Sequence, residues 1–458
     1  MTDRALKLGV LSRRAPIGHT ADLTATLEHV GGLTRVLPAL AEFANLDWTA
    51  LTTQSQAGLP RYYSFSEISN QIQNNNINIF LTEVDNKELA MSDWFCTHYI
   101  WPLLHDVSIP ELDNEVLEQH FNAIVSTSRA MAVECFDIDN DGYFVNDFQL
   151  SQVPATLREL EPTKPITFFL HTPWPKLIPS DSNAIKILEF LASGMLFADV
   201  IQFQTQADLQ GFEQFVIAHM SLEMADVKLE VNPVSVDVHA LQEQALSVKG
   251  AAALSENEVS YVHIARSDPV KKTLAAIKAF TSLAEQLKDS QSRMFLDLFV
   301  VPSRQQWPEY QVLLSDIMKC TKESNSRLSS LGYDPIRLQI GNDYQRVSQA
   351  LTRYDFLIAC SVADGLNLVV KEGAILNTRD GVVVSTPNVG AMAELGQNCV
   401  VAESASEAAV FKALLAASRL SGETRKIMAA NLKSQIQEFD ASYWAQSVVA
   451  NFRILEKV

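Results

Sequence analysis

Cysteine is scarce in this sequence. Its 458 residues include only five cysteines, with no two of them in a C-x-x-C pair: Cys96, Cys135, Cys320, Cys360 and Cys399. The odd number and wide scatter argue against a disulfide framework. Cys96, Cys135 and Cys360 stand among apolar residues, so we expect reduced core side chains in a cytoplasmic protein.

Positive charge and long apolar runs are also lacking. The chain has 36 lysines and arginines against 54 acidic residues, which gives a formal net charge of −18. A field of that sign disfavours nucleic acid and anionic membranes as partners. No apolar stretch reaches the ~20 residues that span a bilayer, and the N-terminus lacks the apolar core of a signal peptide. The oligomeric state stays open, and a homo-oligomer is one of the options.

The remaining composition is that of a folded protein. Apolar residues make up 47% of the chain, and its 17 glycines and 17 prolines are spread without low-complexity tracts. A chain of this length is too long for one core and suits two domains of about 200 residues each.

One stretch, residues 360–396, combines several signals. A buried strand is predicted for 356–360, followed by the turn Asp364-Gly365 and a helix to Leu376; a second strand at 382–384 precedes a second helix near Gly390. Two helix N-termini at one sheet edge can bind a diphosphate. The carboxylates of Asp364 and Glu372 beside such a site suit the hydroxyls of a sugar or a ribose.

The spacing D-G-x-N-L-x-x-x-E, followed by a small-residue turn and A-E-L-G, resembles the donor site of the trehalose-6-phosphate synthase family. These are retaining glycosyltransferases of the GT-B fold. The resemblance covers residues 6–455 and is weakest at 45–90 and 237–257. It implies the α/β class, with two doubly wound Rossmann-like domains facing a cleft. The expected domains are 1–236, binding the acceptor, with a C-terminal helix 443–458 that crosses back, and 237–442, binding the nucleotide sugar.

The resemblance implies a donor site around two basic residues. Arg266 and Lys271 stand in R-S-D-P-V-K, after a strand at 261–265, where the family has R-x-D-x-x-K and binds the donor diphosphate. Basic residues five apart are common on helices, but a strand-to-helix edge adds the helix dipole to their charge. The full implied donor set is Gly32, Arg266, Lys271, Asp364, Gly365, Leu366, Asn367, Leu368 and Glu372.

The implied acceptor site consists of Arg14, Trp101, Asp147 and Arg304. Arg14 follows a strand at 6–12 and Arg304 follows a strand at 294–301, and a guanidinium can bind a phosphate with two parallel hydrogen bonds. Adjacent arginines in a loop are usually just solvated, and a tryptophan in an apolar helix is usually core. Both assignments therefore depend on the resemblance.

His171, Asp147, Arg266 and Lys271 are the implied catalytic residues. His171 ends the predicted strand 166–170 in H-T-P-W-P, and Asp147 takes the place of the aspartate in the family's H-D-Y-H-L. In the family the acceptor hydroxyl attacks on the face that the diphosphate leaves, so no protein nucleophile and no cofactor are needed. The protein supplies positive charge and positions both sugars.

An acidic turn raises the question of a metal. Asp137, Asp139 and Asp141 before Gly142 look like the start of a calcium loop. Such a loop needs a glutamate at its twelfth position, where this chain has Phe148, and a strand rather than a helix follows. We expect no metal.

Four positions depart from the family pattern. Ser92 replaces an acceptor-contacting tyrosine, Ala363 replaces the arginine of R-D-G, Lys272 replaces a glycine, and Asn146 replaces a histidine. The form R-S-D-P-V-K is nearer to validoxylamine 7′-phosphate synthase, a pseudo-glycosyltransferase relative. These departures keep more than one acceptor and donor open.

Three functions are compatible with the sequence. The favoured one transfers glucose from a nucleoside diphosphate glucose to a phosphorylated sugar or polyol. The second keeps the fold but changes the substrates, as in a glucosylglycerol-phosphate synthase or a pseudo-glycosyltransferase that joins cyclitol units. The third is a non-catalytic module that binds sugar phosphates. The sequence names neither the nucleotide base nor the acceptor.

Overall fold

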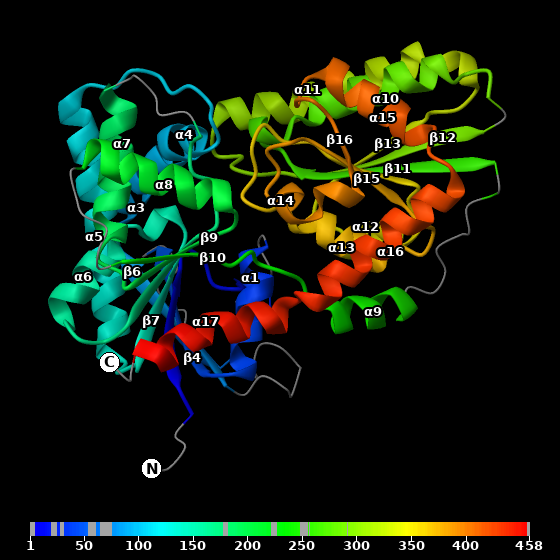
Figure 1. Cartoon of the computed structure of the whole chain (residues 1–458). Coiled ribbons are helices and arrows are strands. Elements are labelled where there is room, and N and C mark those ends of the chain that lie inside the picture. Colours follow the sequence, from blue (N-terminus) through cyan, green and yellow to red (C-terminus); the bar gives the residue numbers. More distant parts are fainter. Residues whose placement is uncertain are drawn as a thin grey trace. The chain divides into compact units, whose positions relative to one another are not determined.

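Two compact units make up the chain (Figure 1): Met1–Val234 with Ala441–Val458, and Ser235–Asp440. The structure, a computed structural model, describes residues 5–19, 25–27, 32–53, 61–64, 76–176, 182–220, 227–247, 255, 257–290 and 292–455. The domain limits expected from the sequence lie two residues from these divisions. No helix in the described ranges is long and apolar enough to cross a membrane.

An eight-stranded sheet forms the centre of the first unit, in the order β10-β9-β8-β7-β1-β4-β6-β5. Its strands are β1 (Lys7–Ser12), β4 (Asn45–Thr53), β5 (Tyr62–Ser64), β6 (Ile77–Val84), β7 (Gly142–Asn146), β8 (Ile166–Leu170), β9 (Val200–Phe203) and β10 (Lys228–Val231). Among the described strands of this sheet, only β5, at one edge, runs antiparallel to its neighbour β6. The residues of β7, β8 and β9 are all buried, as expected for parallel strands covered on both faces. A separate hairpin consists of β2 (Ile17–His19) and β3 (Ala25–Leu27).

Helices connect these strands. They are α1 (Leu33–Val36), η1 (Leu37–Glu42), α3 (Asn86–Phe95), η3 (Cys96–Ile100), α4 (Trp101–Leu104), α5 (Asn114–Asp137), η4 (Phe148–Leu150), α6 (Val153–Leu160), α7 (Ser182–Met195), α8 (Gln206–His219) and α17 (Ala441–Leu455). The helical stretch after Gly32 is α-helical over only four residues, and the rest forms the 3₁₀ helix η1 with Pro38 in its first turn. Proline has no N–H to continue the α-helical pattern.

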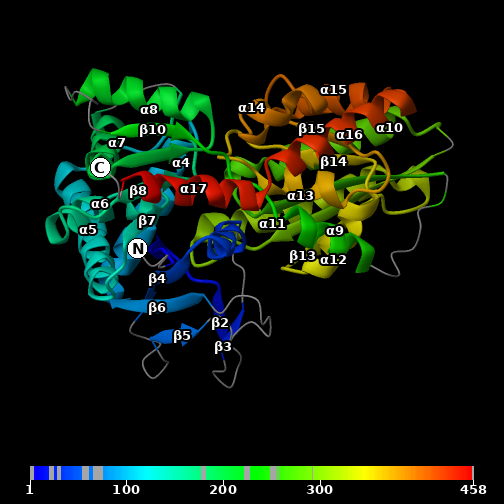
Figure 2. The same ribbon diagram turned by 60° about the horizontal axis from the view of Figure 1, so that its bottom comes forward.

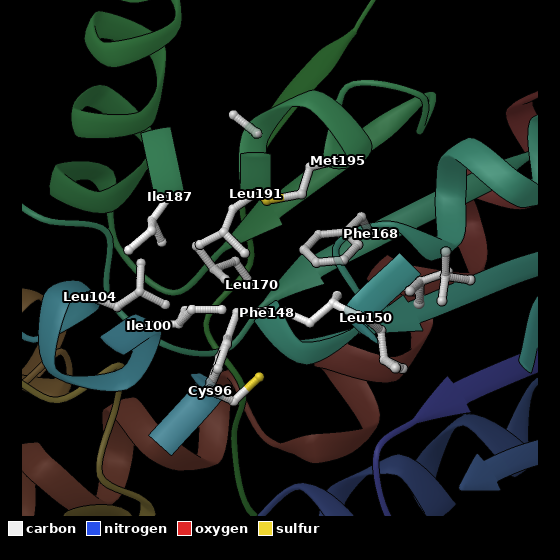
Figure 3. Close-up of a cluster of buried hydrophobic side chains, with 14 of the residues drawn as sticks. Cys96, Ile100, Leu104, Phe148, Leu150, Phe168, Leu170, Ile187, Leu191 and Met195 are labelled. Carbon is white, nitrogen blue, oxygen red and sulfur yellow. The ribbon is translucent and has the colours of Figure 1, made fainter. Parts of the chain in front are cut away.

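The core of the first unit lies where several of these elements meet (Figure 3). Side chains from η3 and α4, from the turn after β7, from β8 and from α7 point toward one another there: Cys96, Ile100, Leu104, Phe148, Leu150, Phe168, Leu170, Ile187, Leu191 and Met195. This packing fixes the chain that leaves β7 and β8 at their carboxyl ends.

The last helix completes the first unit, although the second unit precedes it in the sequence. Helix α17 packs against η1 and β8 (Figure 2). Trp444 is buried, with its ring centroid 6.3 Å from that of Phe144 and 6.2 Å from that of Phe169. Phe452 packs so closely on Gly142 that a Cβ there would lie 2.7 Å from its ring.

A six-stranded parallel sheet forms the second unit, in the order β13-β12-β11-β14-β15-β16. The strands are β11 (Glu258–Arg266), β12 (Arg293–Val301), β13 (Ile336–Ile340), β14 (Phe356–Ala359), β15 (Val382–Ser385) and β16 (Val400–Val401). Numbered within the unit, this is the order 3-2-1-4-5-6 of dinucleotide-binding sheets.

Helices also connect the strands of this unit. They are α9 (Val238–Ser247), η5 (Pro269–Lys271), α10 (Thr273–Gln286), α11 (Pro308–Arg327), η6 (Ser329–Leu331), α12 (Tyr344–Arg353), α13 (Leu368–Leu376), α14 (Ala391–Leu395), η7 (Gly396–Asn398), α15 (Glu407–Ser418) and α16 (Gly422–Glu438). Helix α9 lies in the stretch 237–257, where the resemblance to the family is weakest. It forms because Val238 and Leu241 are buried against the unit and Gln244 Nε2 donates to Ser348 Oγ at 2.8 Å.

Each sheet has a point where neighbouring connections leave in opposite directions. Strand β1 lies between β4 and β7, and strand β11 lies between β12 and β14. The loops that follow such strands diverge at the carboxyl edge, where sheets of this kind bind ligands.

Candidate functional site

Three cations meet at the carboxyl edge of the second sheet. Arg266 is the last residue of β11, Lys271 ends η5, and Arg304 follows β12. Asp268 lies among them with a fully buried carboxylate, which accepts a 2.7 Å hydrogen bond from Arg304 Nη1 and lies 3.9 Å from Arg266 Nη2. Burial raises the pKa of Asp268, but the charges of Arg266, Arg304 and Lys271 outweigh it and lower the pKa below its ordinary value. Asp268 therefore stays ionised and holds the cations in place.

An ion pair joins the segment that follows β11 to the segment that follows β14. Lys271 Nζ pairs with Asp364 Oδ2, and the two side chains are only 14% and 11% exposed. The same carboxylate oxygen accepts from Ser361 Oγ at 3.2 Å. The cation expected to bind a diphosphate is thus already positioned by the carboxylate expected to bind hydroxyls.

Two chain segments come into close contact beside this pair. The N–H of Asp364 donates to Asn388 O, and that of Gly390 donates to Asp364 O, both at 2.9 Å. A Cβ at Gly390 would lie 1.7 Å from the carbonyl oxygen of Gly365. The approach therefore requires glycine at position 390.

The helix starts at this edge differ from what the sequence predicted. Helix α13 begins at Leu368 after Asn367, which has a left-handed backbone (φ 72°) that asparagine tolerates. The second expected helix, α14, has only five residues, so few peptide dipoles add up along it. Of these two helices, only α13 is long enough to act as an anion-binding terminus.

Glu372 lies in the second turn of α13 and is partly buried. Its neighbour Lys371 is buried and pairs with Glu394 on α14, Nζ to Oε1 2.6 Å. Burial lowers the pKa of Lys371, and the carboxylate of Glu394 opposes this shift. The pair ties α13 to α14 and so fixes the backbone on which Glu372 stands.

At the carboxyl edge of the first sheet, Asp147 follows β7. Its backbone is strained, with φ 74° and ψ 164°, a region that residues with a Cβ rarely adopt. The strain is held by its N–H, which donates to Phe169 O at 2.8 Å. Burial raises the pKa of Asp147 to about 6, although backbone N–H groups and the Thr172 hydroxyl stabilise its charge.

His171 follows β8 on the neighbouring strand. Its Nε2 lies 3.0 Å from Asn146 Oδ1, and its Nδ1 lies 3.4 Å from Gln204 Nε2. The ring packs on Phe169 with centroids 4.0 Å apart. Burial lowers the pKa of His171 to about 3, so the ring is neutral at physiological pH.

The two arginines after β1 have different surroundings. Arg13 is bound to Asp93 on α3, with Nε to Oδ1 3.1 Å and Nη2 to Oδ2 2.7 Å. Arg14 is exposed, and its carbonyl accepts from Ser12 Oγ at 2.7 Å. The arginine that the sequence analysis selected is therefore the more accessible of the two.

The other predicted residues of the first unit stand on different elements. Trp101 begins α4, partly buried, with its ring 4.0 Å from that of His105 and 6.3 Å from that of Phe148. Ser92 is buried on α3. Gly32 precedes α1 with φ −68°, a conformation open to any residue, and it lies in the first unit rather than with the other expected donor residues.

The acidic turn before β7 binds other parts of its own unit. Asp141 accepts from the N–H of Lys7 at 2.8 Å, and Asp139 pairs with Lys164 at 2.9 Å. Within the described ranges, no three histidine, cysteine, aspartate or glutamate side chains gather as metal ligands.

The structure thus brings Arg266, Lys271 and Asp364 together, as predicted, and adds Arg304, which the resemblance had assigned to the acceptor. Sequence reasoning missed Asp268, although it is the aspartate of R-S-D-P-V-K. It also gave no role to Gln204, the residue after β9, or to Asn146, the residue before Asp147. Asn146 had been noted only as a departure from the family pattern. These residues can be read in the sequence, but their partners follow other strands, and the sequence does not show which strands are neighbours.

Comparison with known proteins identifies the family. The glycosyltransferase family 20 model matches residues 11–454. The chain belongs to glycosyltransferase family 20. Validamine 7-phosphate valienyltransferase of Streptomyces hygroscopicus subsp. jinggangensis (strain 5008) is 28% identical over 279 residues, 56% of this chain and about half of that protein (53%). Trehalose-6-phosphate synthase of Mycobacterium avium (strain 104) is 26% identical over 390 residues, 77% of this chain and 76% of that one.

Solved structures agree with this family on the fold. A structure from E. coli bound with UDP-2-fluoro glucose has a TM-score of 0.80 at 18% identity, covering 97% of this chain and 98% of that one. The α,α-trehalose-phosphate synthase (UDP-forming) of Burkholderia xenovorans in complex with glucose-6-phosphate has a TM-score of 0.80 at 16% identity, covering 98% and 100%. The membership of a glycosyltransferase family and the GT-B fold class expected from the sequence are confirmed.

Proposed function

We propose that this family 20 chain is a retaining glycosyltransferase that moves glucose from a nucleoside diphosphate glucose to a phosphorylated sugar or polyol, without a cofactor or metal. The observation that carries the proposal is the cation cluster of the second unit. Arg266, Lys271 and Arg304 bring three positive charges to one sheet edge, against the two carboxylates of Asp268 and Asp364. The surplus positive charge suits a diphosphate.

The chemistry follows from that charge. As the bond from the sugar to the diphosphate breaks, negative charge grows on the leaving phosphate, and preorganised cations stabilise it without moving. Attack by the acceptor hydroxyl on the same face needs no protein nucleophile, and the leaving phosphate can take the hydroxyl proton. In the second unit the carboxylates of Asp268 and Asp364 are held by cations. Their task is to position groups rather than to attack the sugar.

In this proposal the first unit binds the acceptor. Asp147, at the end of β7, can accept a hydrogen bond from an acceptor hydroxyl once ionised, and the exposed Arg14 can bind the acceptor phosphate. Both follow neighbouring strands, β1 and β7, at the edge where sheets of this kind bind ligands.

The comparisons support UDP-glucose as the first donor to test. The Burkholderia xenovorans synthase is UDP-forming, and the E. coli structure holds a UDP-glucose analogue. A second candidate is favoured by a specific observation: the similarity to the valienyltransferase, together with R-S-D-P-V-K and a serine at position 92. That candidate joins a cyclitol unit to a phosphorylated cyclitol amine.

A substrate panel separates the two candidates. UDP-, GDP- and ADP-glucose and a nucleoside diphosphate cyclitol are each combined with glucose 6-phosphate, glycerol 3-phosphate and validamine 7-phosphate. Nucleotide release is followed, and the anomeric configuration of the product is determined. Transfer of glucose with retention to a phosphorylated acceptor supports the proposal. Turnover confined to a cyclitol donor favours the second candidate, and no transfer with any pair overturns both.

The donor site has its own test. Arg266→Ala should weaken nucleotide diphosphate binding tenfold to a hundredfold, because a charge-assisted hydrogen bond contributes roughly 1.5–3 kcal/mol. Arg293→Ala is the matched control, since Arg293 begins β12 at the opposite edge of the same sheet. Calorimetry measures both. Equal affinities of wild type and Arg266→Ala for UDP, GDP and ADP would remove Arg266 from the donor site.

A further inference from the structure

We propose that Asn146 and Gln204 are positioning residues that fix His171 as the neutral tautomer with its proton on Nε2. His171 then offers a fixed hydrogen-bond acceptor at Nδ1 and takes no part in proton transfer. The tautomer follows from the geometry alone, whereas its use at the sugar site rests on the proposed function.

The orientation of the Asn146 amide comes first. Asn146 is fully buried, and its Nδ2 donates to the carbonyl oxygens of Leu11 and Phe144, both at 3.1 Å. Carbonyl oxygens only accept, so the nitrogen of the amide must face them. Its oxygen is left to face His171 Nε2 at 3.0 Å. Since an amide oxygen only accepts, Nε2 must carry the hydrogen.

The other ring nitrogen is fixed in the same way. The Oε1 of Gln204 accepts from the N–H of Val234 at 3.0 Å, which leaves its NH₂ group toward His171 Nδ1 at 3.4 Å. An N–H on Nδ1 would point hydrogen at hydrogen. This excludes both the other tautomer and the protonated ring, and it agrees with the lowered pKa of His171.

The charges around the ring do not oppose this state. The groups from neighbouring elements are Asp147 after β7, Phe169 on β8 and Gln204 after β9. The carboxylate of Asp147 accepts from the backbone N–H groups of His171 and Thr172 rather than from the ring. Among the described residues, the ring's polar neighbours are thus two amides.

The functional consequence concerns the proton of the acceptor hydroxyl. A histidine beside a reacting sugar would ordinarily be a first choice for a general base. Here the lone pair of His171 Nδ1 faces the NH₂ group of Gln204 at 3.4 Å, which is long for a hydrogen bond. A sugar hydroxyl can therefore compete for Nδ1, but a proton transferred to Nδ1 cannot remain on it. His171 is thus excluded as the general base, which agrees with proton transfer to the leaving phosphate in the proposed mechanism.

The test is a spectroscopic one on the full chain. The protein is labelled with ¹⁵N-histidine, and the His171 signals are assigned among the nine histidines by their loss in His171→Gln. Between pH 8 and pH 5 we expect the shifts of a neutral Nε2–H ring that do not change. A His171 that titrates in this range, or that carries its proton on Nδ1, overturns the proposal.

Variants test the two amides. In Asn146→Asp, a carboxylate faces Nε2, and the pKa of His171 should rise by at least about one unit. Asn140→Asp is the matched control, because Asn140 is also a buried amide of this unit but contacts Cys135 instead. If Asn146→Asp does not fold, Gln204→Glu places a carboxylate at Nδ1 and keeps the acceptor for Val234. A His171 pKa that neither variant raises contradicts the inference. If the tautomer is confirmed and no substrate pair is turned over, only the proposed function fails.

Discussion

Asp147 combines a strained backbone with a buried charge. A positive φ with extended ψ costs a residue with a Cβ roughly 1–3 kcal/mol and persists where the surroundings hold it. Here the hydrogen bond to Phe169 O and the buried ring of Phe148 on the next residue hold it. An aspartate kept in this conformation, with its pKa raised to about 6 by burial, supports a role at the acceptor.

The first prediction concerns pH. The ionised carboxylate of Asp147 accepts a hydroxyl hydrogen bond more strongly than the protonated group does, so kcat/KM for the acceptor should rise with pH and level off above an apparent pKa near 6. Asp147→Asn should remove this acid limb. Asp208→Asn is the control: burial raises the pKa of Asp208 to about 6 as well, but an amide can keep its contacts with Trp174 N–H and the Thr205 hydroxyl. If Asp208→Asn loses the acid limb and Asp147→Asn keeps it, the assignment of this limb to Asp147 is wrong.

At the scale of elements, α10 is preceded by a residue whose backbone conformation is unfavourable for its side chain. Lys272 is left-handed, with φ 48°, at the position where the family has glycine. The departure noted in the sequence therefore has a local energetic consequence, because a left-handed residue with a Cβ costs roughly 1–2 kcal/mol.

Lys272→Gly should stabilise the protein. The relief of the left-handed strain exceeds the extra entropy that glycine loses on folding, so we expect a gain of about 0.5–1 kcal/mol in the free energy of unfolding. Lys278→Gly in the middle of the same helix is exposed and should instead destabilise it by about 1 kcal/mol. Urea denaturation of both variants decides; a loss of stability in Lys272→Gly would contradict the account.

The contact between the chain segments at Asp364 and Gly390 gives another prediction. In Gly390→Ala the new Cβ would overlap the Gly365 carbonyl, so the segments must separate and nucleotide affinity should fall at least about tenfold. Gly422→Ala at the start of α16 is the control, since nothing lies within 4 Å of its Cβ position. Calorimetry with UDP compares the two, and unchanged affinity in Gly390→Ala would show that the loop tolerates the shift.

Elements and site were predictable from the sequence to different degrees, for physical reasons. Strand β8 is buried along its whole length, so its apolar run gave its limits correctly. Helix α9 was missed because only two of its residues are buried, which leaves little periodicity to detect. The motifs of the candidate site follow the ends of apolar strands, so they could be located in the sequence. Partners such as Asp268 with Arg304, or His171 with Gln204, depend on which strands are neighbours, which the sequence alone does not state.

At the scale of the whole molecule, the first unit is built from two distant segments. Residues 1–234 supply its sheet, and α17 supplies Trp444 and Phe452 to its core. Trp444→Ala should therefore lower the free energy of unfolding of this unit by roughly 3–5 kcal/mol, the usual effect of removing a buried large aromatic side chain.

Tyr443→Ala provides the comparison for that substitution, because Tyr443 is its neighbour on α17 and is 51% exposed. It should change stability by less than about 0.5 kcal/mol. Differential scanning calorimetry reports both variants. Equal effects at the two positions would mean that α17 contributes little to the core.

The place of α17 after the second unit in the sequence also orders events during synthesis. After Val234 the ribosome must translate the second unit, Ser235–Asp440, before the helix that covers β8 exists. At about 5–20 residues per second, this leaves the first unit unfinished for on the order of 10–40 s, with Phe144 and Phe169 lacking their cover from Trp444. A nascent chain that stops early exposes this apolar surface to chaperones and proteases. Completion of the first unit thereby reports that the second unit has been translated.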